Sequence, residues 1–310
     1  MKILHAPEII AGQSTLISRA QRDLGLKSDV LVFNEHPFNY KYDICLNISK
    51  KSPIIKIISS LGINFVKCLF KYDVFHFHFR NSLLPYNIDL PILKLLGKKI
   101  IMHYHGSDIR GKSEGVMVKK FADIVFVSTP DLLKYVPNST WIPNLIDLDE
   151  LNYIGIENDV DTIKIIHAPT NRLKKGTEYV IKAIEKLKKE GYKINLILLE
   201  NIPNNKVIDY YRKADIVIDQ LLIGWYGVFS IECMALGKPV CVYIQEDLES
   251  YMPSNPVMNT SPKNIIENLK ILIEDAKLRK ELGEKGRKYV EEVHDSKKIA
   301  KQLIELYECI

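Results

Sequence analysis

Cysteine and long apolar runs are both scarce in this sequence of 310 residues. The five cysteines are Cys45, Cys68, Cys233, Cys241 and Cys309. Because no two of them form a Cys-x-x-Cys pair, their spacing indicates neither a disulfide framework nor a zinc site. No stretch approaches the ~18 uncharged apolar residues of a membrane-spanning helix, and the N-terminal run ILHAPEIIAG is too short for a signal peptide. These absences favour a cytoplasmic protein, soluble or bound peripherally to a membrane.

Several signatures of catalysis are missing as well. The sequence has no Walker A loop, no Gly-x-Gly-x-x-Gly, no Gly-x-Ser-x-Gly and no His-Glu-x-x-His. Their absence argues against a P-loop NTPase, a dehydrogenase, a serine hydrolase and a zinc protease.

What the chain does contain is an alternation of short apolar runs with segments of helical period, the pattern of a parallel sheet covered on both faces. The first half has strand-like runs in KILHA, SDVLVF, DVFHFHF, KKIIMHYH and DIVFVS. The second half has them in IKIIHA, KINLILL, ADIVIDQ and KPVCVYI. The hexapeptide KILHAP at residue 2 returns almost unchanged as KIIHAP at residue 164, so each half is predicted to open with the first strand of its own Rossmann-like domain.

The boundaries follow from composition. The stretch VPNSTWIPNLIDLDE is rich in Pro and Asn and is expected to link the domains. Just before it, STPDLLKYV predicts a helix capped by Ser128 or Thr129 with Pro130 in its first turn. We therefore predict domains at residues 1–145 and 146–292, followed by a helical tail at 293–310.

Charge is distributed unevenly between the halves. Residues 1–145 carry 19 Lys and Arg against 11 Asp and Glu, a net charge of +8, whereas the whole chain is +5. Between Asp43 and Asp73 there are five lysines and no acid. This segment suits either an anionic membrane surface or an ordinary amphipathic helix that packs Ile57, Leu61, Phe65 and Leu69 on a sheet. The two interpretations are compatible.

The stretch HAPTNRLKKGTEYV places Lys175 and Gly176 between a strand and a helix. An ammonium group and the free N–H groups of a helix start favour an anion such as a phosphate. The alternative is a solvated lysine in front of an ordinary helix.

A second stretch, DQLLIGWYGVFSIECMALGKPVCVYI, has a glycine-rich loop and a helix that begins near Gly227. Glu232 lies within this helix among apolar residues and needs a partner, because burying an acid unpaired is costly. Sugar hydroxyls could serve it, while the N–H groups of Gly227, Val228 and Phe229 could hold phosphate. The alternative partner for Glu232 is a nearby lysine or the backbone.

These residues resemble the family 4 glycosyltransferases. GWYGVFSIECMALGKPV looks like the glutamate-containing signature of that family, and LKKGTEYVIKAIEKL like its phosphate-binding element. The resemblance extends to DVFHFHF, HYHGSD, IPNLID and the helical tail. It implies a GT-B fold, with two Rossmann-like domains facing across a cleft and a last helix returning to the first domain. It also implies transfer from a nucleotide-diphospho-sugar with retention of configuration and without an essential metal or other cofactor.

The resemblance also assigns roles to individual residues. It makes Lys175 the residue that neutralises the donor diphosphate and Glu232 the residue that holds the ribose. It places His105 at the reacting face of the sugar, where the alternative is a core histidine, and Gly12 close to the donor phosphates. His76, His78 and His103 are expected to be structural or on the acceptor side.

The sequence departs from the family pattern at two positions. Gly224 stands where the family has its first glutamate, so the sugar would be held by the backbone or by Trp225 and Tyr226. Thr170 stands where the family has an arginine, and Arg172 is the candidate substitute as a phosphate ligand. Two Asp-x-Asp triplets, at 147–149 and 159–161, imitate the metal site of the other glycosyltransferase fold but lie in the linker and before a strand.

The expected partners are a UDP-sugar or GDP-sugar donor and a glycan or lipid-linked acceptor of cell-surface polysaccharide synthesis, with membrane contact through the basic first domain and no nucleic acid. Two rival functions remain. One is a nucleotide-sugar 2-epimerase with the same fold. The other is a non-catalytic partner that only binds nucleotide sugar, as the changes at Gly224 and Thr170 would permit.

Overall fold

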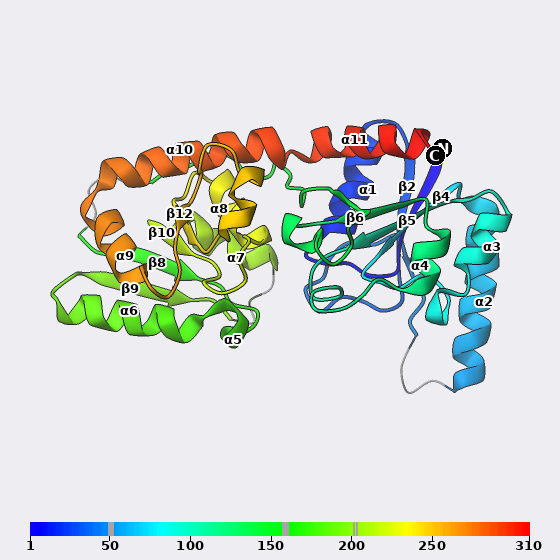
Figure 1. Ribbon diagram of the computed structural model, residues 1–310, viewed down its shortest axis with the longest axis horizontal. Coiled ribbons are helices and arrows are strands. Elements are labelled where there is room, and N and C mark those ends of the chain that lie inside the picture. Colours follow the sequence, from blue (N-terminus) through cyan, green and yellow to red (C-terminus); the bar gives the residue numbers. More distant parts are fainter. Residues whose placement is uncertain (49–52, 157–160, 201, 203) are drawn as a thin grey trace. The chain divides into compact units, whose positions relative to one another are not determined.

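The computed structural model describes residues 1–48, 53–156, 161–200, 202 and 204–310. The chain divides into two compact units, which we call unit 1 (Met1–Leu145 with Ser296–Ile310) and unit 2 (Ile146–Asp295). Each unit is built on one sheet whose paired strands all run parallel. Helices lie on both faces of each sheet (Figure 1). The α/β class and the parallel, doubly wound arrangement are confirmed.

The sheet of unit 1 has the order β3-β2-β1-β4-β5-β6-β7. Its strands are β1 (Lys2–Ala6), β2 (Lys27–Val32), β3 (Ile44–Cys45), β4 (Val74–His78), β5 (Lys99–Tyr104), β6 (Ile124–Val127) and β7 (Thr140–Trp141). The central strands are completely buried because both of their faces are covered, which explains their nearly continuous apolar runs. β7 falls inside the predicted linker, so the first sheet extends further along the chain than composition indicated.

The helices of unit 1 are α1 (Gln13–Asp23), α2 (Ile54–Lys71), α3 (Leu90–Leu95), α4 (Val116–Phe121) and α11 (Ser296–Glu308). α2, α3 and α4 pack on one face of the sheet through an apolar cluster that includes Leu61, Phe65, Leu93 and Val118. α1 and α11 pack on the other face, where Ile17 and Leu303 share a cluster with strand residues. The returning segment begins at Ser296 rather than at residue 293, because the preceding helix runs through Val293.

The sheet of unit 2 has the order β12-β11-β10-β8-β9. Its strands are β8 (Ile163–His167), β9 (Ile194–Leu198), β10 (Ile216–Ile218), β11 (Val240–Val242) and β12 (Met258–Asn259). Its helices are α5 (Arg172–Lys175), α6 (Thr177–Lys189), α7 (Asn204–Arg212), α8 (Val228–Ala235), α9 (Ile265–Glu274) and α10 (Ala276–Val293). α6 and α9 share the main apolar cluster of this unit, and α8 lies on the side of α10 (Figure 1).

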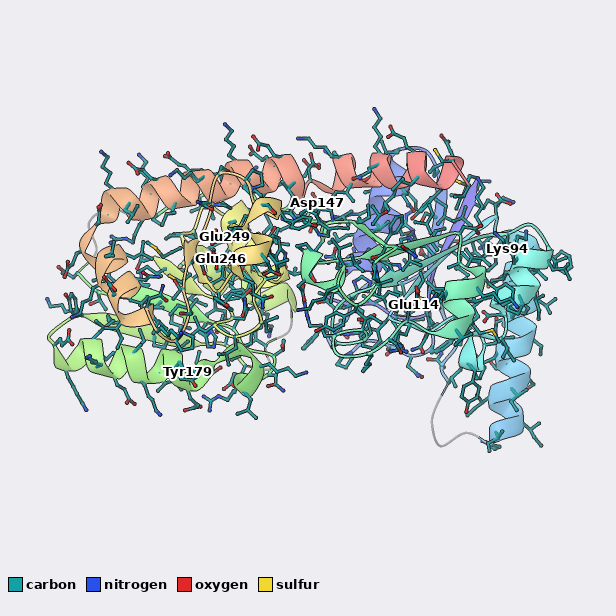
Figure 2. The ribbon with its side chains drawn as sticks, viewed as in Figure 1. Lys94, Glu114, Asp147, Tyr179, Glu246 and Glu249 are labelled. Carbon is teal, nitrogen blue, oxygen red and sulfur yellow. The ribbon has the colours of Figure 1, made fainter. Side chains whose placement is uncertain are left out.

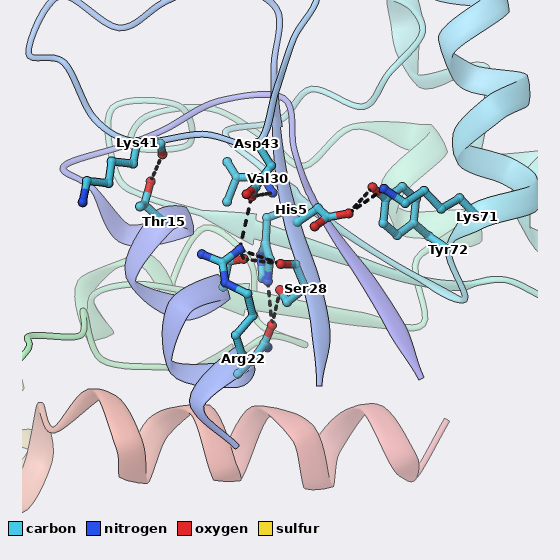
Figure 3. A network of polar contacts seen from close by, with 12 residues as sticks. His5, Thr15, Arg22, Ser28, Val30, Lys41, Asp43, Lys71 and Tyr72 are labelled. Atoms are coloured by element: carbon cyan, nitrogen blue, oxygen red, sulfur yellow. Dashed lines mark hydrogen bonds and ion pairs between the residues drawn. The ribbon is translucent and has the colours of Figure 1, made fainter. Parts of the chain in front are cut away.

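An aspartate immediately before a strand joins that strand to its neighbour at four places. The backbone N–H of Asp43 donates to Val30 O (2.9 Å), and its carboxylate accepts from Val30 N (2.8 Å; Figure 3). Asp73 makes the same pair of bonds with Lys2, Asp123 with Ile100 and Asp215 with Lys164. Each such aspartate, which we call a register aspartate, fixes the alignment of two parallel strands at the edge where they begin.

The helix predicted from STPDLLKYV is wrong. Pro130–Leu132 forms a single 3₁₀ turn, and neither Ser128 nor Thr129 caps it with its side chain. Both hydroxyls serve other groups: Ser128 Oγ lies 2.8 Å from His105 Nδ1, and Thr129 Oγ1 accepts from Arg110 Nη2 (3.2 Å).

α2 is the amphipathic helix expected in the basic segment. Leu61 and Phe65 are buried and Leu69 packs on the same cluster, as predicted, while Ile57 is only partly buried. Lys50 and Lys51 of this segment lie outside the described residues. No helix in the described part of the chain is both long enough and apolar enough to span a membrane.

Candidate functional site

Two loops meet at the carboxyl edge of the unit 2 sheet. One follows β8 and contains α5, and the other follows β10 and leads to α8. Because β8 and β10 are neighbours, both loops leave the sheet side by side, and Leu221 N donates to Lys175 O (3.1 Å). In open parallel sheets this edge is where ligands bind.

Lys175 and the start of α8 are brought together by Asp219, at the end of β10. Lys175 Nζ pairs with Asp219 Oδ1, while Asp219 Oδ2 accepts from Gly227 N (3.0 Å) and Ser230 Oγ (2.7 Å). Burial opposes the charge of Asp219, but Lys175 and these hydrogen bonds hold its pKa below the ordinary value. A Cβ atom on Gly227 would lie 3.7 Å from the Lys175 ammonium. The cation and the helix start therefore occupy one small region.

The N–H groups at the start of α8 divide into two kinds. The Gly227 N–H is engaged by Asp219, so it is not available to a phosphate as the sequence analysis expected. Val228 and Phe229 are the first residues of the helix, where backbone N–H groups have no partner within the helix. The Phe229 ring is buried against Tyr211, with 4.9 Å between ring centroids. An anion at this end would find the N–H groups of Val228 and Phe229 together with the Lys175 ammonium.

Glu232 lies a little more than one turn into α8. Its side chain makes no hydrogen bond or ion pair with any residue that the structure describes. Enclosure by protein raises the pKa of its carboxyl from 4.5 to about 8. The lysine or backbone partner considered from sequence is therefore not there. Glu232 is thus a partly buried acid without a protein partner, at the edge where parallel sheets bind ligands, which makes it a candidate functional residue.

The loop at Gly224 is organised by Gln220. Gln220 Oε1 accepts from the N–H groups of Leu222 (2.9 Å), Ile223 and Gly224 (3.3 Å), and its Nε2 donates to two carbonyls, Trp225 O (3.1 Å) and Tyr243 O (2.6 Å). Gly224 has φ +94°, and a Cβ atom there would lie 2.4 Å from Gln245 Cγ. Only glycine fits this position, so the departure from the family pattern is built into the loop.

Trp225 and Tyr226 do not present their rings to a ligand. Both are buried, and Tyr226 OH bonds Tyr289 OH (2.7 Å) and His294 Nε2 (2.9 Å). The suggestion that these two side chains hold the sugar is therefore wrong. In this loop the groups left for a sugar are main-chain atoms.

Arg172 lies on the other side of β8 from Lys175. Its guanidinium pairs with Glu178 (3.6 Å) and with Glu200 (3.2 Å), which follows β9. Thr170 is exposed in the loop between β8 and α5. Since β9 and β10 flank β8 on opposite sides, the structure does not bring Arg172 to the group formed by Lys175, Asp219 and Gly227.

His167, at the end of β8, connects the sheet to the start of α6, which follows the Lys175 loop. Its Nδ1 lies 2.8 Å from Ile218 O, and its Nε2 lies 2.9 Å from Thr177 Oγ1. A carbonyl only accepts, so Nδ1 carries the proton and Nε2 accepts from the Thr177 hydroxyl. This fixes the first residue of α6, and with it the turn at Gly176, to the sheet.

In unit 1, Gly12 (φ +73°) begins α1 directly after the β1 loop, with the Tyr40 ring beside it. His105 follows β5, and both of its ring nitrogens are already engaged: Nε2 lies 3.0 Å from His78 Nδ1 and Nδ1 lies 2.8 Å from Ser128 Oγ. The sequence analysis considered His105 either at the reacting face of the sugar or as a core histidine. Its ring nitrogens bond to groups inside unit 1, which is the behaviour of a core histidine.

His105 belongs to a closed ring of hydrogen bonds, which we call the histidine circuit. In order, the circuit joins Gln21, His5, His78, His105, Ser128, His103, His76, Tyr307 and Gln21 again. Gln21 Oε1 accepts from Ser28 Oγ and so faces His5, which sets the direction of the whole circuit. Every histidine then carries its proton on Nε2 and accepts at Nδ1.

All five rings of the circuit are neutral. Burial is the main cause that lowers their pKa values, to about 4 for His5 and about 3 for His105, and well below the ordinary value for His76, His78 and His103. Two overlapping groups, His5 with His76 and His78, and His78 with His103 and His105, have ligand nitrogens within 4.8 Å of one another. The circuit occupies these nitrogens, so the geometry favours hydrogen bonding over metal ligation.

Asp219, Gln220 and the circuit were not predicted. Asp219 and Gln220 carried one signal, since polar residues directly after a buried strand point to the ligand edge of a parallel sheet. In the first Asp-x-Asp triplet, Asp147 accepts from the backbone N–H of Asp149 (2.8 Å), whereas Asp159 of the second triplet lies outside the described residues.

No family model matches the sequence, and a search of curated proteins finds no match. Solved structures do match over the full length. HepE from Anabaena, in complex with UDP-glucose, has a TM-score of 0.72 at 12% identity and covers 100% of both chains. Sucrose-phosphate synthase from Thermosynechococcus elongatus has a TM-score of 0.70 at 16% identity, covering 99% of this chain and 98% of that one.

A third match carries a different activity. A protein described as a UDP-N-acetylglucosamine 2-epimerase from Listeria monocytogenes has a TM-score of 0.60 at 13% identity, covering 98% of this chain and 94% of that one. At these identities the likeness concerns the fold. The chain has the GT-B fold, as predicted, and shares it with GT-B glycosyltransferases.

Proposed function

We propose that this protein is a retaining glycosyltransferase of family 4 that moves a sugar from a UDP-sugar or GDP-sugar to a glycan or lipid-linked acceptor in cell-surface polysaccharide synthesis. The observation that carries the proposal is the pairing of a cationic helix start with an unpartnered acid in α8. Lys175 and the N–H groups of Val228 and Phe229 suit a diphosphate. Glu232 suits the vicinal hydroxyls of a ribose, which donate to a carboxylate.

The chemistry follows from where charge develops. As the bond between the sugar and the diphosphate breaks, the leaving oxygens gain negative charge. The acceptor hydroxyl attacks from the same face, and its proton passes to the leaving diphosphate. Lys175, held by Asp219, and the positive end of α8 stabilise the leaving oxygens without moving, which is the kind of electrostatic preorganisation that often supplies the largest catalytic term. The leaving group is neutralised by these groups, so the proposal includes no essential metal.

Calorimetry with UDP, GDP and their sugars tests the donor site directly. We expect one nucleoside diphosphate to bind, and to bind about as tightly as its sugar nucleotide, because Gly224 leaves no carboxylate to hold the sugar. If neither nucleotide raises the melting temperature or releases heat, the donor site is refuted.

For the acceptor we propose a lipid-linked substrate reached from the inner face of a membrane. α2 leaves Ile55 and Phe70 each 83% exposed, together with Ile54 and Ile58. These side chains stand on a segment with five lysines and no acid, so apolar contact and attraction to anionic lipid would act together. This helix is the part of unit 1 best suited to an anionic bilayer.

The two rivals are separated by product analysis. An epimerase releases an altered sugar nucleotide from donor alone, with no acceptor present. A non-catalytic partner binds nucleotide sugar yet neither transfers nor hydrolyses the sugar across an acceptor panel. Transfer that requires acceptor, with no isomer formed from donor alone, excludes both.

A further inference from the structure

Unit 1 has a pocket of about 680 Å³ at the carboxyl edge of its sheet. Its wall is made by the loop that follows β4, including Arg80, Tyr86 and Asn87, and by the loop that follows β5, including Asp108, Lys112 and Val116. Neither the donor site nor the histidine circuit uses these side chains. The pocket lies entirely within unit 1.

The β4 loop that forms one wall is firmly built. Phe79, Arg80, Tyr86 and Asn87 all have φ between 59° and 65°, a left-handed conformation that residues other than glycine rarely adopt. Asn87 supports this backbone by accepting from Ser82 N (2.9 Å) and donating to Arg80 O (3.0 Å). The wall is therefore preorganised and does not have to form when a ligand arrives.

The pocket carries two cations without carboxylate partners. Arg80 Nη1 donates to Asp108 O (3.2 Å) and Lys112 Nζ to Ser107 O (3.2 Å); neither makes an ion pair with a described residue. The one acid on the wall, Asp108, is buried, and its carboxylate accepts from His105 N (3.1 Å) and Gly106 N (2.7 Å). Asp108 is thus held by the loop backbone, while Arg80 and Lys112 line the pocket. Burial raises the pKa of Asp108, and the charge of Arg80 opposes this rise.

The rim of the pocket is apolar. Tyr86 is 92% exposed and Val116 is 81% exposed, and the neighbouring α3 leaves Leu95 and Ile92 in solvent. Glu114, which lies on the same loop as Lys112 and is labelled in Figure 2, does not line the pocket. Two cations beside an apolar rim match a ligand that has an anionic head and a hydrocarbon part.

We propose that this pocket binds the phosphate of an amphiphile, with the phosphate between Arg80 and Lys112 and the hydrocarbon chain along Tyr86, Val116 and α3. Arginine binds phosphate oxygens through two parallel N–H bonds, and lysine adds a point charge. The identification of this ligand as the acceptor rests on the proposed transferase activity. The proposal that the pocket binds it does not depend on that activity.

The test is calorimetric titration of the full chain with three probes and no sugar nucleotide: dihexanoyl phosphatidic acid, dihexanoyl phosphatidylcholine and glycerol 3-phosphate. We expect the first to bind at least tenfold more tightly than the other two. Lys112→Ala and Arg80→Ala should each weaken it about tenfold, since one charged hydrogen bond contributes about 1.5 kcal/mol or more. Tyr86→Ser should weaken phosphatidic acid and leave glycerol 3-phosphate unchanged.

Lys27→Ala is the matched control, because this exposed lysine begins β2 at the opposite edge of the same sheet. It should bind like the wild type. Lys112 is exposed with a single backbone bond, so its variant will fold even if Arg80→Ala does not. Equal affinity for phosphatidic acid in Lys112→Ala and wild type overturns the proposal, as does equal affinity of the wild type for all three probes. Donor binding, titrated separately, shows whether the proposed transferase site fails independently.

Discussion

The two units open with the same strand but use its histidine differently. His5 lies near the end of β1 and His167 ends β8; each is the fourth residue of the repeated hexapeptide, and both are completely buried. In unit 1 the histidine joins a closed circuit of neutral groups that ends where it begins. In unit 2 it bonds only Ile218 and Thr177, and so steadies the loop that presents Lys175.

The comparison teaches that a shared strand does not imply a shared task. At the carboxyl edge of unit 1, four further histidine rings join His5 in hydrogen bonds that also include Gln21, Ser128 and Tyr307, and burial keeps all five rings neutral. At the same edge of unit 2, polar residues hold a lysine against a helix start. The polar groups of the first edge are satisfied internally, whereas the second edge keeps a cation beside free backbone N–H groups.

The largest expected difference between the two units is in how much stability each loses in acid. Burial keeps the five circuit histidines neutral, whereas in the unfolded chain they bind protons near pH 6.5. Their contribution is complete above pH 6.5 and is lost as pH falls toward the lowered pKa values. Each histidine can remove about 1.4 kcal/mol of stability per pH unit, so unit 1 should lose several kcal/mol between pH 6.5 and 5.5.

The chain offers a probe for each unit, since its two tryptophans are Trp141 in unit 1 and Trp225 in unit 2. Urea unfolding of Trp225→Phe reports unit 1 and that of Trp141→Phe reports unit 2. Equal losses of stability in the two units on acidification would contradict the circuit's neutrality.

Lys175→Ala should have the next largest effect, because it leaves Asp219 charged, buried and unpaired. We expect unit 2 to lose about 3–5 kcal/mol of stability, and transferase activity to fall roughly 10²-fold or more. The double variant Lys175→Ala with Asp219→Asn removes both charges. It should recover most of the stability while nucleoside diphosphate affinity stays low. Recovery of both would reduce Lys175 to a structural role.

Glu232→Gln should weaken nucleoside diphosphate binding by about 1.5–3 kcal/mol, and sugar-nucleotide binding equally, because the ribose is common to both. The pKa of Glu232 is about 8 in the free protein, and ribose hydroxyls donate best to the ionised form. Wild-type affinity should therefore rise with pH up to about 8, by at most about tenfold per unit. A calorimetric pH series that rises identically in Glu232→Gln would exclude this assignment.

Gly224→Ala should destabilise unit 2 by about 1–3 kcal/mol from its φ alone, and further through the clash with Gln245. Gly191→Ala is the matched control: its φ is +98°, yet no atom lies within 4 Å of the added Cβ. The difference between the two melting curves measures the clash. A Gly224→Glu variant that restores the family's acid should fail for the same reason, and tight sugar-nucleotide binding by it would show that the loop can move.

The smallest effect is expected on the proposed membrane binding, which we assign to α2 of unit 1. Ile55→Glu and Phe70→Glu should each reduce sedimentation with phosphatidylglycerol vesicles about tenfold, since burying one such side chain contributes about 1.5–3 kcal/mol. Leu24→Glu, 46% exposed on the same unit, should have no effect. Dimerisation in place of vesicle binding would assign the exposed face of α2 to a second copy of the chain.

Much of the fold could be predicted, because buried parallel strands leave continuous apolar runs and helices leave a 3.6-residue period. The proximity of Lys175 to the start of α8 could also be predicted, because each follows the end of a strand in the same parallel sheet. β7 was missed because two residues at a sheet edge leave no pattern. The 3₁₀ turn was missed because Ser128 and Thr129 are suited to capping, yet tertiary partners engage their hydroxyls.

The rest of the site depends on contacts between residues far apart in the chain. Nothing in the local sequence distinguishes Gln220 from other polar residues. It organises the Gly224 loop through hydrogen bonds to that loop and to Tyr243, which only the folded chain brings together. The histidine circuit joins residues of α1, β1, β4, β5 and α11 with others that follow β5 and β6, so no local pattern in the sequence predicts it. Tyr226 was misplaced because its hydrogen-bond partners, Tyr289 and His294, lie more than 60 positions away. Trp225 was misplaced with it, because its ring stacks on the buried Tyr226 ring.

The register aspartates place strand alignment and ligand-facing loops at opposite edges of each sheet. Asp43, Asp73, Asp123 and Asp215 all stand where strands begin, so strand alignment is set at the edge remote from the Lys175 site and from the pocket of unit 1. Loops at the other edge can then change length, charge and specificity without shifting any strand past its neighbour. A variant that keeps these four acids should therefore tolerate altered loops at the carboxyl edges while its strands stay in alignment.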